Sequence, residues 1–271
     1  MLKGKKIGII GVGKLGEAIT LGLIKKGVVT AKDISGSVKH ERSIERVKSR
    51  IGIEVTMDTA SMIAGKDIII IAVKPQNVTY VAEQICPNVQ QDQIVISLAA
   101  SVTTGYIEDR LPPDIPVIRA MPNTPSVINE GMTVICKGRA ATHEHMAIAE
   151  EIFKAVGRVV TLDESLMDGV TALSGSGPAY MYMVIESLAE AGVKLGIPRD
   201  TSTLLAAQTM LGASKLVLET KQHPALLKDT VTTPAGCTID GLLELEDGGL
   251  RVTLIKAVVK AAERASQLVS K

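Results

Sequence analysis

The sequence predicts an α/β fold in its first part and an all-α fold in the rest, and three observations support this. Short apolar runs alternate with helical patterns from the start to about residue 135, which is typical of a parallel sheet with helices on both faces. One continuous apolar run, at residues 68–73, suits a central strand that is buried on both sides. After Thr161 only helical patterns remain, separated by Gly and Pro.

The elements of the first part follow one another as strand and helix. Strands are expected where short apolar runs occur, at residues 6–10, 33–37, 67–73, 94–97, 117–120 and 133–136. Helical patterns stand between most of these runs, including one at 15–26 and a charged one at 41–50. This alternation predicts a doubly wound sheet.

The second part consists of helical patterns that end at Gly or Pro. Helices are expected at residues 164–173, 177–195, 199–219, 224–231, 238–245 and 249–270. The change of pattern places a boundary near residue 162. The sequence therefore predicts two domains, residues 1–162 and 163–271.

The composition argues against two classes of partner. Thirty Lys and Arg balance 29 Asp and Glu, and a formal net charge of +1 gives no field that would attract nucleic acid or an anionic membrane. Four Tyr, one Phe and no Trp leave few side chains on which bases could stack. We expect no nucleic-acid partner and no membrane partner.

The chain shows no export signal and no disulfide framework. Its N-terminus enters a strand pattern at once, and the run at 68–73 is far too short to span a bilayer. Cys86, Cys136 and Cys237 are odd in number and widely spaced, which fits a reducing compartment. These features predict a cytoplasmic protein.

No metal site is expected. His143 and His145 flank Glu144, but they lack the i, i+4 spacing with which a helix places two histidines on one zinc ion. We interpret them as exposed polar surface.

The helix at 199–219 predicts self-association. It is apolar around most of its circumference, whereas a helix on the surface of a monomer has a polar face. A domain of this size has limited interior for such helices, so a subunit interface is favoured over a central position in a monomer. We expect a homo-oligomer.

A glycine fingerprint predicts a dinucleotide site. Residues 7–10 form a strand pattern that runs directly into Gly11, Gly13 and Gly16, spaced as G-x-G-x-x-G, and then into a helix. The first glycine permits a tight turn, the second lets the backbone approach a pyrophosphate, and the third lets helix and strand pack closely. A Rossmann-type domain is the predicted fold, and the alternative is a merely structural Gly-rich turn.

The end of the second strand favours NADPH as the cofactor, with NADH as the weaker alternative. Enzymes that bind NAD place an acidic residue there, about 20 residues after the glycines. Here Ser37, Lys39 and Arg42 occupy the region and are suited to a 2′-phosphate. The alternative is that Lys39 and Arg42 are only the solvated start of a charged helix.

Two further strand ends carry candidate ligands, because ligands of open α/β sheets bind at the carboxyl ends of strands. Lys74 and Pro75 follow the buried strand. Asn123 lies between two prolines in a rigid loop, where it is a candidate partner of a nicotinamide amide or of a substrate edge. A plain turn residue is the alternative for Asn123.

The segment 232–241, TTPAGCTIDG, resembles a small anion site. Pro234 and Gly236 make a tight turn, and Cys237 and Thr238 open a helical pattern, so free backbone N–H groups would point out of a helix N-terminus. An ordinary helix cap is the alternative.

The motifs together resemble pyrroline-5-carboxylate reductase over the whole chain. They are the glycine fingerprint, AVKP at 72–75, RAMPNTP at 119–125, LSGSGPAY at 173–180, and HP at 223–224 with LKD at 227–229 leading into TPAGCTI at 233–239. The resemblance implies NADPH-dependent reduction of 1-pyrroline-5-carboxylate to L-proline. It also implies a helical C-terminal domain that interlocks with a second subunit, dimers that often assemble further, and an active site shared between two subunits.

The resemblance also implies roles for individual residues. It places the substrate carboxylate at Thr233, Gly236, Cys237 and Thr238, with the Thr238 hydroxyl near the ring nitrogen as the catalytic group. With the strand-end residues given above, the predicted cofactor contacts are the glycines and the following residues: Lys14, Leu15, Ser37, Lys39, Thr59, Ala72, Val73, Lys74, Pro75 and Asn123. Lys14, Leu15, Thr59 and Cys237 depart from the residues usual in the family.

For two residues in these motifs, Cys237 and Ser174, both a functional and a passive role are considered. Cys237 stands at a helix N-terminus, where the pKa of a thiol falls, but hydride transfer to an imine needs no nucleophile, so a passive role is favoured. Ser174 lies in a Gly-Ser hinge at 174–178 and is a candidate substrate ligand. The alternative is that the small residues of the hinge only let the following helix approach the cofactor closely.

Two rival functions stay open at this point. A β-hydroxyacid dehydrogenase shares the domain layout but needs a base, and residues 178–187 contain no Lys or His. A nucleotide sensor without catalysis would have no need for the second anion site at 233–238.

Overall fold

The computed structural model describes residues 2–268 and divides into two compact units. The first consists of Met1–Ser176 with Ala261–Lys271, and the second of Gly177–Lys260. This division by packing falls after the π-helix at 171–175, whereas the boundary expected at residue 162 marks the end of the last strand. The domain limits 1–162 and 163–271 stay a prediction.

The first unit contains one eight-stranded sheet in the order β3-β2-β1-β4-β5-β6-β7-β8. The first six positions are parallel and form the 3-2-1-4-5-6 arrangement of a dinucleotide-binding domain. β7 is antiparallel to β6, and β8 is parallel to β7. The strands are β1 (Ile7–Ile10), β2 (Ile34–Ser37), β3 (Glu54–Thr56), β4 (Ile68–Ile71), β5 (Ile94–Ser97), β6 (Val117–Met121), β7 (Gly131–Lys137) and β8 (Gly157–Thr161).

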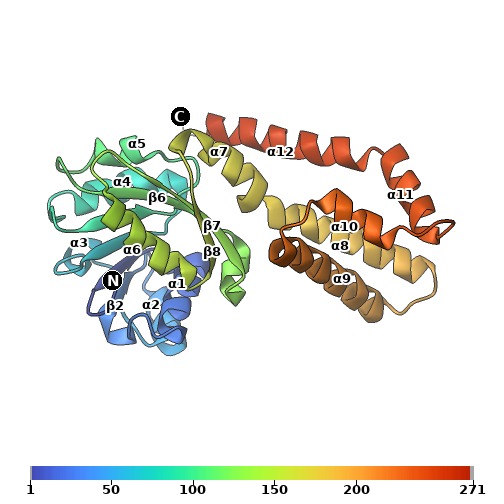
Figure 1. The fold of residues 1–271 in the computed structure, drawn as a ribbon. Coiled ribbons are helices and arrows are strands. Elements are labelled where there is room, and N and C mark those ends of the chain that lie inside the picture. The colour runs from blue at the N-terminus through green and yellow to red at the C-terminus, as the bar shows by residue number, and fades with distance from the viewer. Residues whose placement is uncertain (1, 269–271) are drawn as a thin grey trace. The chain divides into compact units, whose positions relative to one another are not determined.

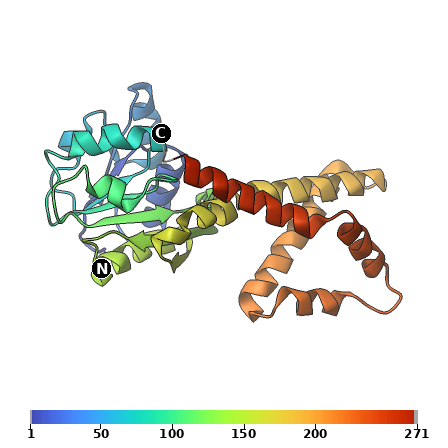
Figure 2. The same cartoon turned by 90° about the horizontal axis from the view of Figure 1, so that it is seen from above.

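Helices cover both faces of this sheet (Figures 1 and 2). They are α1 (Lys14–Lys25), α2 (Arg42–Ile51), α3 (Thr59–Met62), α4 (Val78–Ile85), α5 (Thr104–Glu108), α6 (His143–Lys154) and α7 (Met167–Val170). Short 3-10 helices η1 (Ala31–Asp33), η2 (Pro75–Asn77), η3 (Thr124–Ile128) and η4 (Glu164–Leu166) connect them, and the π-helix η5 (Thr171–Gly175) follows α7. The predicted Rossmann-type fold is confirmed.

β4 shows why the sheet has two apolar faces. Its side chains alternate, so that Ile68 and Ile70 join the core on the side of α1 and α6, and Ile69 and Ile71 join the core on the side of α4 and α5. All four isoleucines are fully buried. The continuous apolar run is therefore the central covered strand that the sequence predicts.

Two strands were absent from the prediction. β3 has three residues and lies at the sheet edge, where only Val55 is buried. β8 lies at the opposite edge, where none of its five residues is fully buried and Arg158 interrupts the apolar pattern. Short edge strands carry a weak pattern because one side has no partner strand.

The second unit is helical, as predicted. Its helices are α8 (Gly177–Lys194), α9 (Arg199–Thr220), α10 (Pro224–Val231), α11 (Cys237–Asp247) and the first part of α12 (Leu250–Gln267). Of the helix predicted at 249–270, residues 269 and 270 lie outside the described residues. α8 and α9 pack on each other, and Ser202 of α9 fits against Gly192 of α8.

The helices of the second unit leave many apolar side chains uncovered within one chain. Leu204, Leu205, Leu211 and Leu218 of α9 are each more than half exposed. Apolar surface of this extent is typical of a protein–protein interface. This agrees with the self-association predicted for the helix at 199–219.

Among residues 2–268, no helix combines the length and the apolar character that crossing a bilayer requires.

Candidate functional site

The three glycines after β1 meet three different constraints. Gly11 has φ +92°, and a Cβ there would lie 2.8 Å from Cγ1 of Val73 and 2.9 Å from the carbonyl oxygen of Ala72. A Cβ on Gly16 would lie 2.9 Å from the carbonyl oxygen of Gly11. At Gly13, no atom of the described chain lies within 4 Å of such a Cβ. The first and third glycines are thus required by packing, and the second faces the open space that a phosphate needs.

The N-terminus of α1 presents free donors to that space. Gly13 is the N-cap and no side chain caps the helix. The N–H of Glu17 donates to the carbonyl oxygen of Gly13 at 2.8 Å, whereas the N–H groups of Lys14, Leu15 and Gly16 have no acceptor among residues 2–268. Free N–H groups at the positive end of a helix dipole suit an anion, so the loop fits the pyrophosphate of a dinucleotide.

The sheet brings the other predicted cofactor residues to this loop. The N–H of Gly11 donates to the carbonyl oxygen of Ser37 at 2.9 Å, which joins the ends of β1 and β2. The N–H of Ala72 donates to the carbonyl oxygen of Ile10 at 2.8 Å, which joins the ends of β1 and β4. Ser37, Ala72 and Val73 therefore border the glycine loop, as expected for carboxyl ends of neighbouring parallel strands.

A buried hydroxyl pair lies at the end of β2. The hydroxyl of Thr59 donates to Oγ of Ser37 at 3.0 Å, and both residues are buried. Lys39 and Arg42 follow within five residues of Ser37 and are exposed, and so is Lys74 at the N-cap of η2. Two hydroxyls with exposed cations nearby, and no carboxylate at the end of β2, suit a phosphate monoester.

Ser37→Asp is expected to shift cofactor preference toward NADH. A carboxylate at this strand end repels the 2′-phosphate and accepts a hydrogen bond from a ribose hydroxyl. We expect the ratio of kcat/KM for NADPH to that for NADH to fall at least about tenfold, or about 1.4 kcal/mol. Ser37→Asn, similar in shape but uncharged, should move the ratio much less. An unchanged ratio in the Asp variant would reject this placement of the phosphate.

Asn123 connects the sheet to the π-helix instead of pointing free. Its side-chain oxygen accepts the N–H of Met132 at 2.9 Å, and its side-chain nitrogen donates to the carbonyl oxygen of Ser174 at 3.0 Å. At the end of η5, the N–H of Ser176 donates to the carbonyl oxygen of Thr171, five residues back. The Ser174 hydroxyl donates to the carbonyl oxygen of Val170. Asn123 thus positions the π-helix, a feature that is frequent at functional sites.

The segment 233–236 forms a tight turn at the predicted substrate loop. The N–H of Gly236 donates to the carbonyl oxygen of Thr233 at 3.0 Å, with Pro234 at the second position and Ala235 at φ +58° at the third. A Cβ on Gly236 would collide with the Thr233 hydroxyl and lie 3.2 Å from the Thr233 carbonyl oxygen. Gly236 lets Thr233 fold back over the turn, and its own N–H is used within it.

The turn leads into a helix N-terminus with free donors. Gly236 is the N-cap of α11, and no side chain caps the helix. The N–H groups of Cys237 and Thr238 have no acceptor in the described part of the chain. Cys237 is exposed and Thr238 is half-buried. Two N–H groups and the nearby hydroxyls of Thr233 and Thr238 therefore form a set of donors that suits a small anion.

A buried charge network lies beside β6 and was not found by sequence reasoning. The Arg119 guanidinium is almost fully buried and lies 3.6 Å from carboxylate oxygens of Glu164 and Asp168. Glu164 also accepts the N–H and the hydroxyl of Thr104, each at 2.7 Å. Burial, with Glu164 nearby, raises the pKa of Cys136 to about 12, so this thiol is no nucleophile. The only sequence signal was a cation inside an apolar strand.

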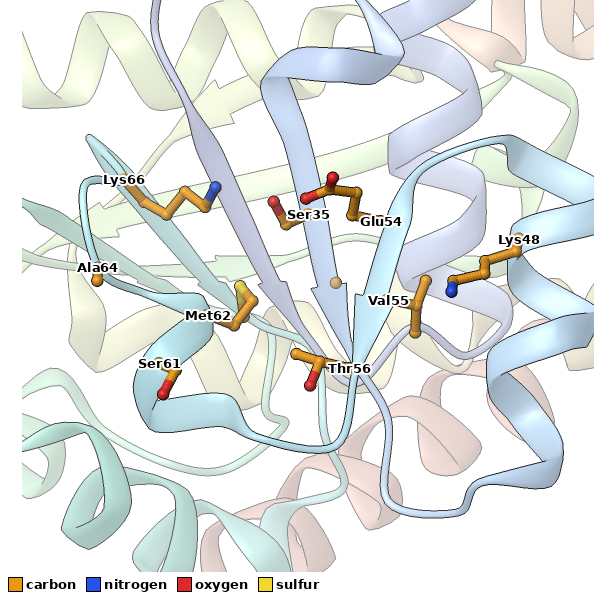
Figure 3. Close-up of a pocket in the computed structure, with 10 residues that line it drawn as sticks. Ser35, Lys48, Glu54, Val55, Thr56, Ser61, Met62, Ala64 and Lys66 are labelled. Atoms are coloured by element: carbon orange, nitrogen blue, oxygen red, sulfur yellow. The ribbon is translucent and has the colours of Figure 1, made fainter.

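The cavity shown in Figure 3 lies apart from the predicted site residues. It has a volume of about 440 Å³ and is lined by Ser35, Glu54, Thr56 and Lys66 with their neighbours. Its lining includes Thr56, the last residue of β3, but none of the residues that directly follow β1, β2 and β4, where ligands of such sheets bind. Burial, followed by the charge of Lys6, lowers the pKa of Lys66. No predicted site residue lines this cavity.

Histidines serve as helix caps in two places. His145 pairs with Thr142 in a capping box at the start of α6, and Nδ1 of His223 accepts the N–H of Ala225 at the start of α10. Among residues 2–268 there is no group of three or more His, Cys, Asp or Glu side chains arranged to hold a metal ion.

Two family models match the chain, one in each part. The model described as "NADP oxidoreductase coenzyme F420-dependent" matches residues 6–101. The model described as "Pyrroline-5-carboxylate reductase dimerisation" matches residues 164–268. The first match contains the glycine loop, and the second contains the turn at 233–236.

Proteins named pyrroline-5-carboxylate reductase are similar to the chain over nearly its full length. The protein of Methanosarcina acetivorans is 43% identical over 267 residues, covering 98% of this chain and 99% of its own. The solved structure from Coxiella burnetii has a TM-score of 0.90 at 36% identity and covers 97% of this chain and 98% of its own. The structure of a Plasmodium falciparum protein named pyrroline carboxylate reductase, solved with NADP bound, has a TM-score of 0.90 at 28% identity and covers 99% of this chain and 100% of its own.

Proposed function

The chain belongs to the pyrroline-5-carboxylate reductase family, and we propose on this premise that it reduces 1-pyrroline-5-carboxylate to L-proline with NADPH. The observation that carries the proposal is the pair of uncapped helix N-termini, one after the glycine loop and one after the turn at 233–236. One suits a pyrophosphate and the other a small carboxylate. A nucleotide sensor would need only the first.

The residues of the first unit bind and orient the cofactor. When bound, NADPH supplies the hydride. The N–H groups of Lys14, Leu15 and Gly16 hold the pyrophosphate, and Ser37 with Thr59, Lys39 and Arg42 holds the 2′-phosphate. The remaining predicted contacts are Ala72, Val73, Lys74, Pro75 and Asn123, of which Asn123 acts through the π-helix that its amide supports.

The turn of the second unit holds the substrate carboxylate. The N–H groups of Cys237 and Thr238 donate to it, and the Thr233 hydroxyl adds a third donor. Each charge-assisted hydrogen bond contributes on the order of 1.5 to 3 kcal/mol. Gly236 keeps the turn closed. Anchoring the carboxylate fixes the direction of the C=N bond, and orientation of this kind supplies much of the rate gain in hydride transfer.

The chemistry requires little acid–base help from the chain. An imine is protonated before the hydride arrives, so the ring nitrogen needs only a hydrogen-bond partner during the reaction. The Thr238 hydroxyl fills this role directly or through a water molecule. Ser174, in the π-helix, is the further candidate for a substrate contact.

The activity is tested by NADPH absorbance with and without 1-pyrroline-5-carboxylate. Oxidation of NADPH that appears only with the imine supports the reductase, and NADH is expected to work less well. Cofactor binding without turnover would instead support a nucleotide sensor. Oxidation of β-hydroxyacids with NADP⁺ would support the alcohol dehydrogenase alternative.

Thr238→Ala is expected to lower kcat between about tenfold and about 100-fold, with a smaller change in KM for the imine. The variant removes a hydrogen bond to the ring nitrogen but keeps the backbone N–H groups that bind the carboxylate. Thr238→Ser, which retains the hydroxyl, is the matched control and should stay within a few-fold of wild type. Normal turnover in the Ala variant would show that the hydroxyl is not used.

The protein is a homo-oligomer, and we propose that residues 163–271 form its substrate-binding and dimerisation domain. The dimerisation model matched at 164–268 and the exposed leucines of α9 support this assignment. We further propose interlocked dimers in which one subunit's cofactor meets the other's turn. A cytoplasmic location is also part of the proposal, supported by the free cysteines Cys86, Cys136 and Cys237.

A further inference from the structure

A buried carboxylate lies in the first turns of the helix that receives the cofactor pyrophosphate. Glu17 belongs to α1, three residues after Lys14, and is only 4% exposed. An acidic side chain near a helix N-terminus stabilises the helix itself. It also opposes the binding of a second anion at the same end, and a pyrophosphate is such an anion.

Two arginines of α2 approach this carboxylate. Nη1 of Arg46 forms an ion pair with Oε1 of Glu17, and Nη1 of Arg50 lies 3.4 Å from Oε2. Arg46 and Arg50 are one helical turn apart, so they reach the same point of α1. Their side chains are 49% and 61% exposed, whereas that of Glu17 is 6% exposed. The burial of Glu17 thus depends on partners that reach it from the surface.

The Arg46 guanidinium also approaches the glycine loop. Its Nη2 lies 3.5 Å from the carbonyl oxygen of Val12, the residue between Gly11 and Gly13. The Arg46 guanidinium therefore contacts both the Glu17 carboxylate and the backbone of the glycine loop. The carboxylate and the loop are thus separated by no more than the width of one guanidinium group. At such a distance an unpaired carboxylate would weaken the binding of a diphosphate.

We propose that Arg46 is a positioning residue for the cofactor: it neutralises Glu17 and thereby keeps the N-terminus of α1 receptive to the pyrophosphate of NADP(H). The inference rests on the proposed function, because it names how this chain supports its own cofactor loop. Arg50 is the weaker partner, since its distance to Glu17 is longer and it has no contact with Val12 in the described residues.

The test is a double-mutant cycle read by direct binding of NADP⁺ to the intact oligomer, using titration calorimetry. Arg46→Met keeps the length of the side chain and removes its charge. It is expected to raise Kd about tenfold, which corresponds to about 1.4 kcal/mol. Glu17→Gln combined with Arg46→Met removes the carboxylate charge as well and should restore Kd to within about threefold of wild type.

Two controls separate neutralisation from a general effect of charge or fold. Lys48→Ala removes an exposed cation from the same helix and should leave Kd within about twofold. KM for the imine should stay unchanged in all variants, because α1 and α2 belong to the cofactor-binding unit.

Each outcome of the cycle decides the inference. A weakened single variant with a restored double variant supports it. Equal Kd for wild type and Arg46→Met, or a double variant as weak as the single one, would overturn it, because a role in loop shape alone is not rescued by removing the Glu17 charge. A wild-type protein that failed to bind NADP⁺ would overturn the proposed function, and the inference with it.

Discussion

Gly11→Ala is expected to abolish measurable NADP(H) binding. Ala at φ +92° costs roughly 1–2 kcal/mol, and its methyl group would stand 2.8 Å from Val73 and 2.9 Å from the Ala72 carbonyl oxygen. Relief of that overlap costs typically about 1–3 kcal/mol more and moves the loop away from the end of β4. We expect Kd for NADP⁺ to rise more than about 100-fold, measured by titration calorimetry on the purified oligomer.

Gly52→Ala is the matched control for Gly11→Ala. Gly52 has φ +80° at the C-terminus of α2, and no atom of the described chain lies within 4 Å of a Cβ there. Ala at this position has the same kind of backbone strain, but its methyl group overlaps with no other atom and Gly52 lies outside the predicted cofactor site. The control should lower stability by roughly 1 kcal/mol and leave Kd unchanged. Normal cofactor affinity in Gly11→Ala would show that the glycine loop does not bind the cofactor.

Gly236→Val is expected to raise KM for 1-pyrroline-5-carboxylate on the order of 100-fold. A Cβ at this position already collides with the Thr233 hydroxyl, and the two further methyl groups of Val prevent the turn from closing. Opening the turn withdraws Thr233 and disturbs the N–H groups of Cys237 and Thr238. Loss of one or two charge-assisted hydrogen bonds corresponds to about 3 kcal/mol. Steady-state kinetics at saturating NADPH measures the effect.

Cys237→Ala is the control for the substrate turn. The neighbouring side chain is removed while the backbone N–H remains, so KM and kcat should both stay within about twofold of wild type. This control also tests the alternative of a nucleophilic thiol, which would require a large loss of turnover. If Gly236→Val kept a normal KM, the carboxylate would have to bind elsewhere.

The order and placement of the main elements could be predicted from the sequence. The buried run at 68–73 and the alternation around it led to the doubly wound sheet, and Gly and Pro marked α8, α9 and α10 nearly to the residue. The edge strand β3 was missed because a three-residue strand with one buried side chain carries almost no pattern. Patterns report burial, and edge strands have little of it.

The free N–H donors at the two candidate anion sites were predicted in part. The sequence indicated free N–H groups at 236–238, but it could not show that the Gly236 N–H is used inside the turn, because that depends on Ala235 adopting φ +58°. The Asn123 side chain was predicted to contact the nicotinamide or the substrate. In the structure its amide forms hydrogen bonds with the backbone of Met132 and Ser174. Such contacts join segments far apart in sequence, which periodicity does not record.

The partners of charged residues could not be predicted at all. Glu17 and Arg46 are 29 residues apart and meet because α1 and α2 pack on the same face of the sheet. Arg119 meets Glu164 only once β6 and η4 are in place. A single sequence gives the charges but not their pairing.

The proposed function requires that two sets of exposed peptide N–H groups bind the cofactor phosphate and the substrate carboxylate. A crystal structure of the oligomer with NADP⁺ and a proline analogue tests it most directly. We expect the pyrophosphate at the N–H groups of Lys14 and Leu15, and the analogue's carboxylate at those of Cys237 and Thr238. An analogue bound away from the turn at 233–236 would contradict it.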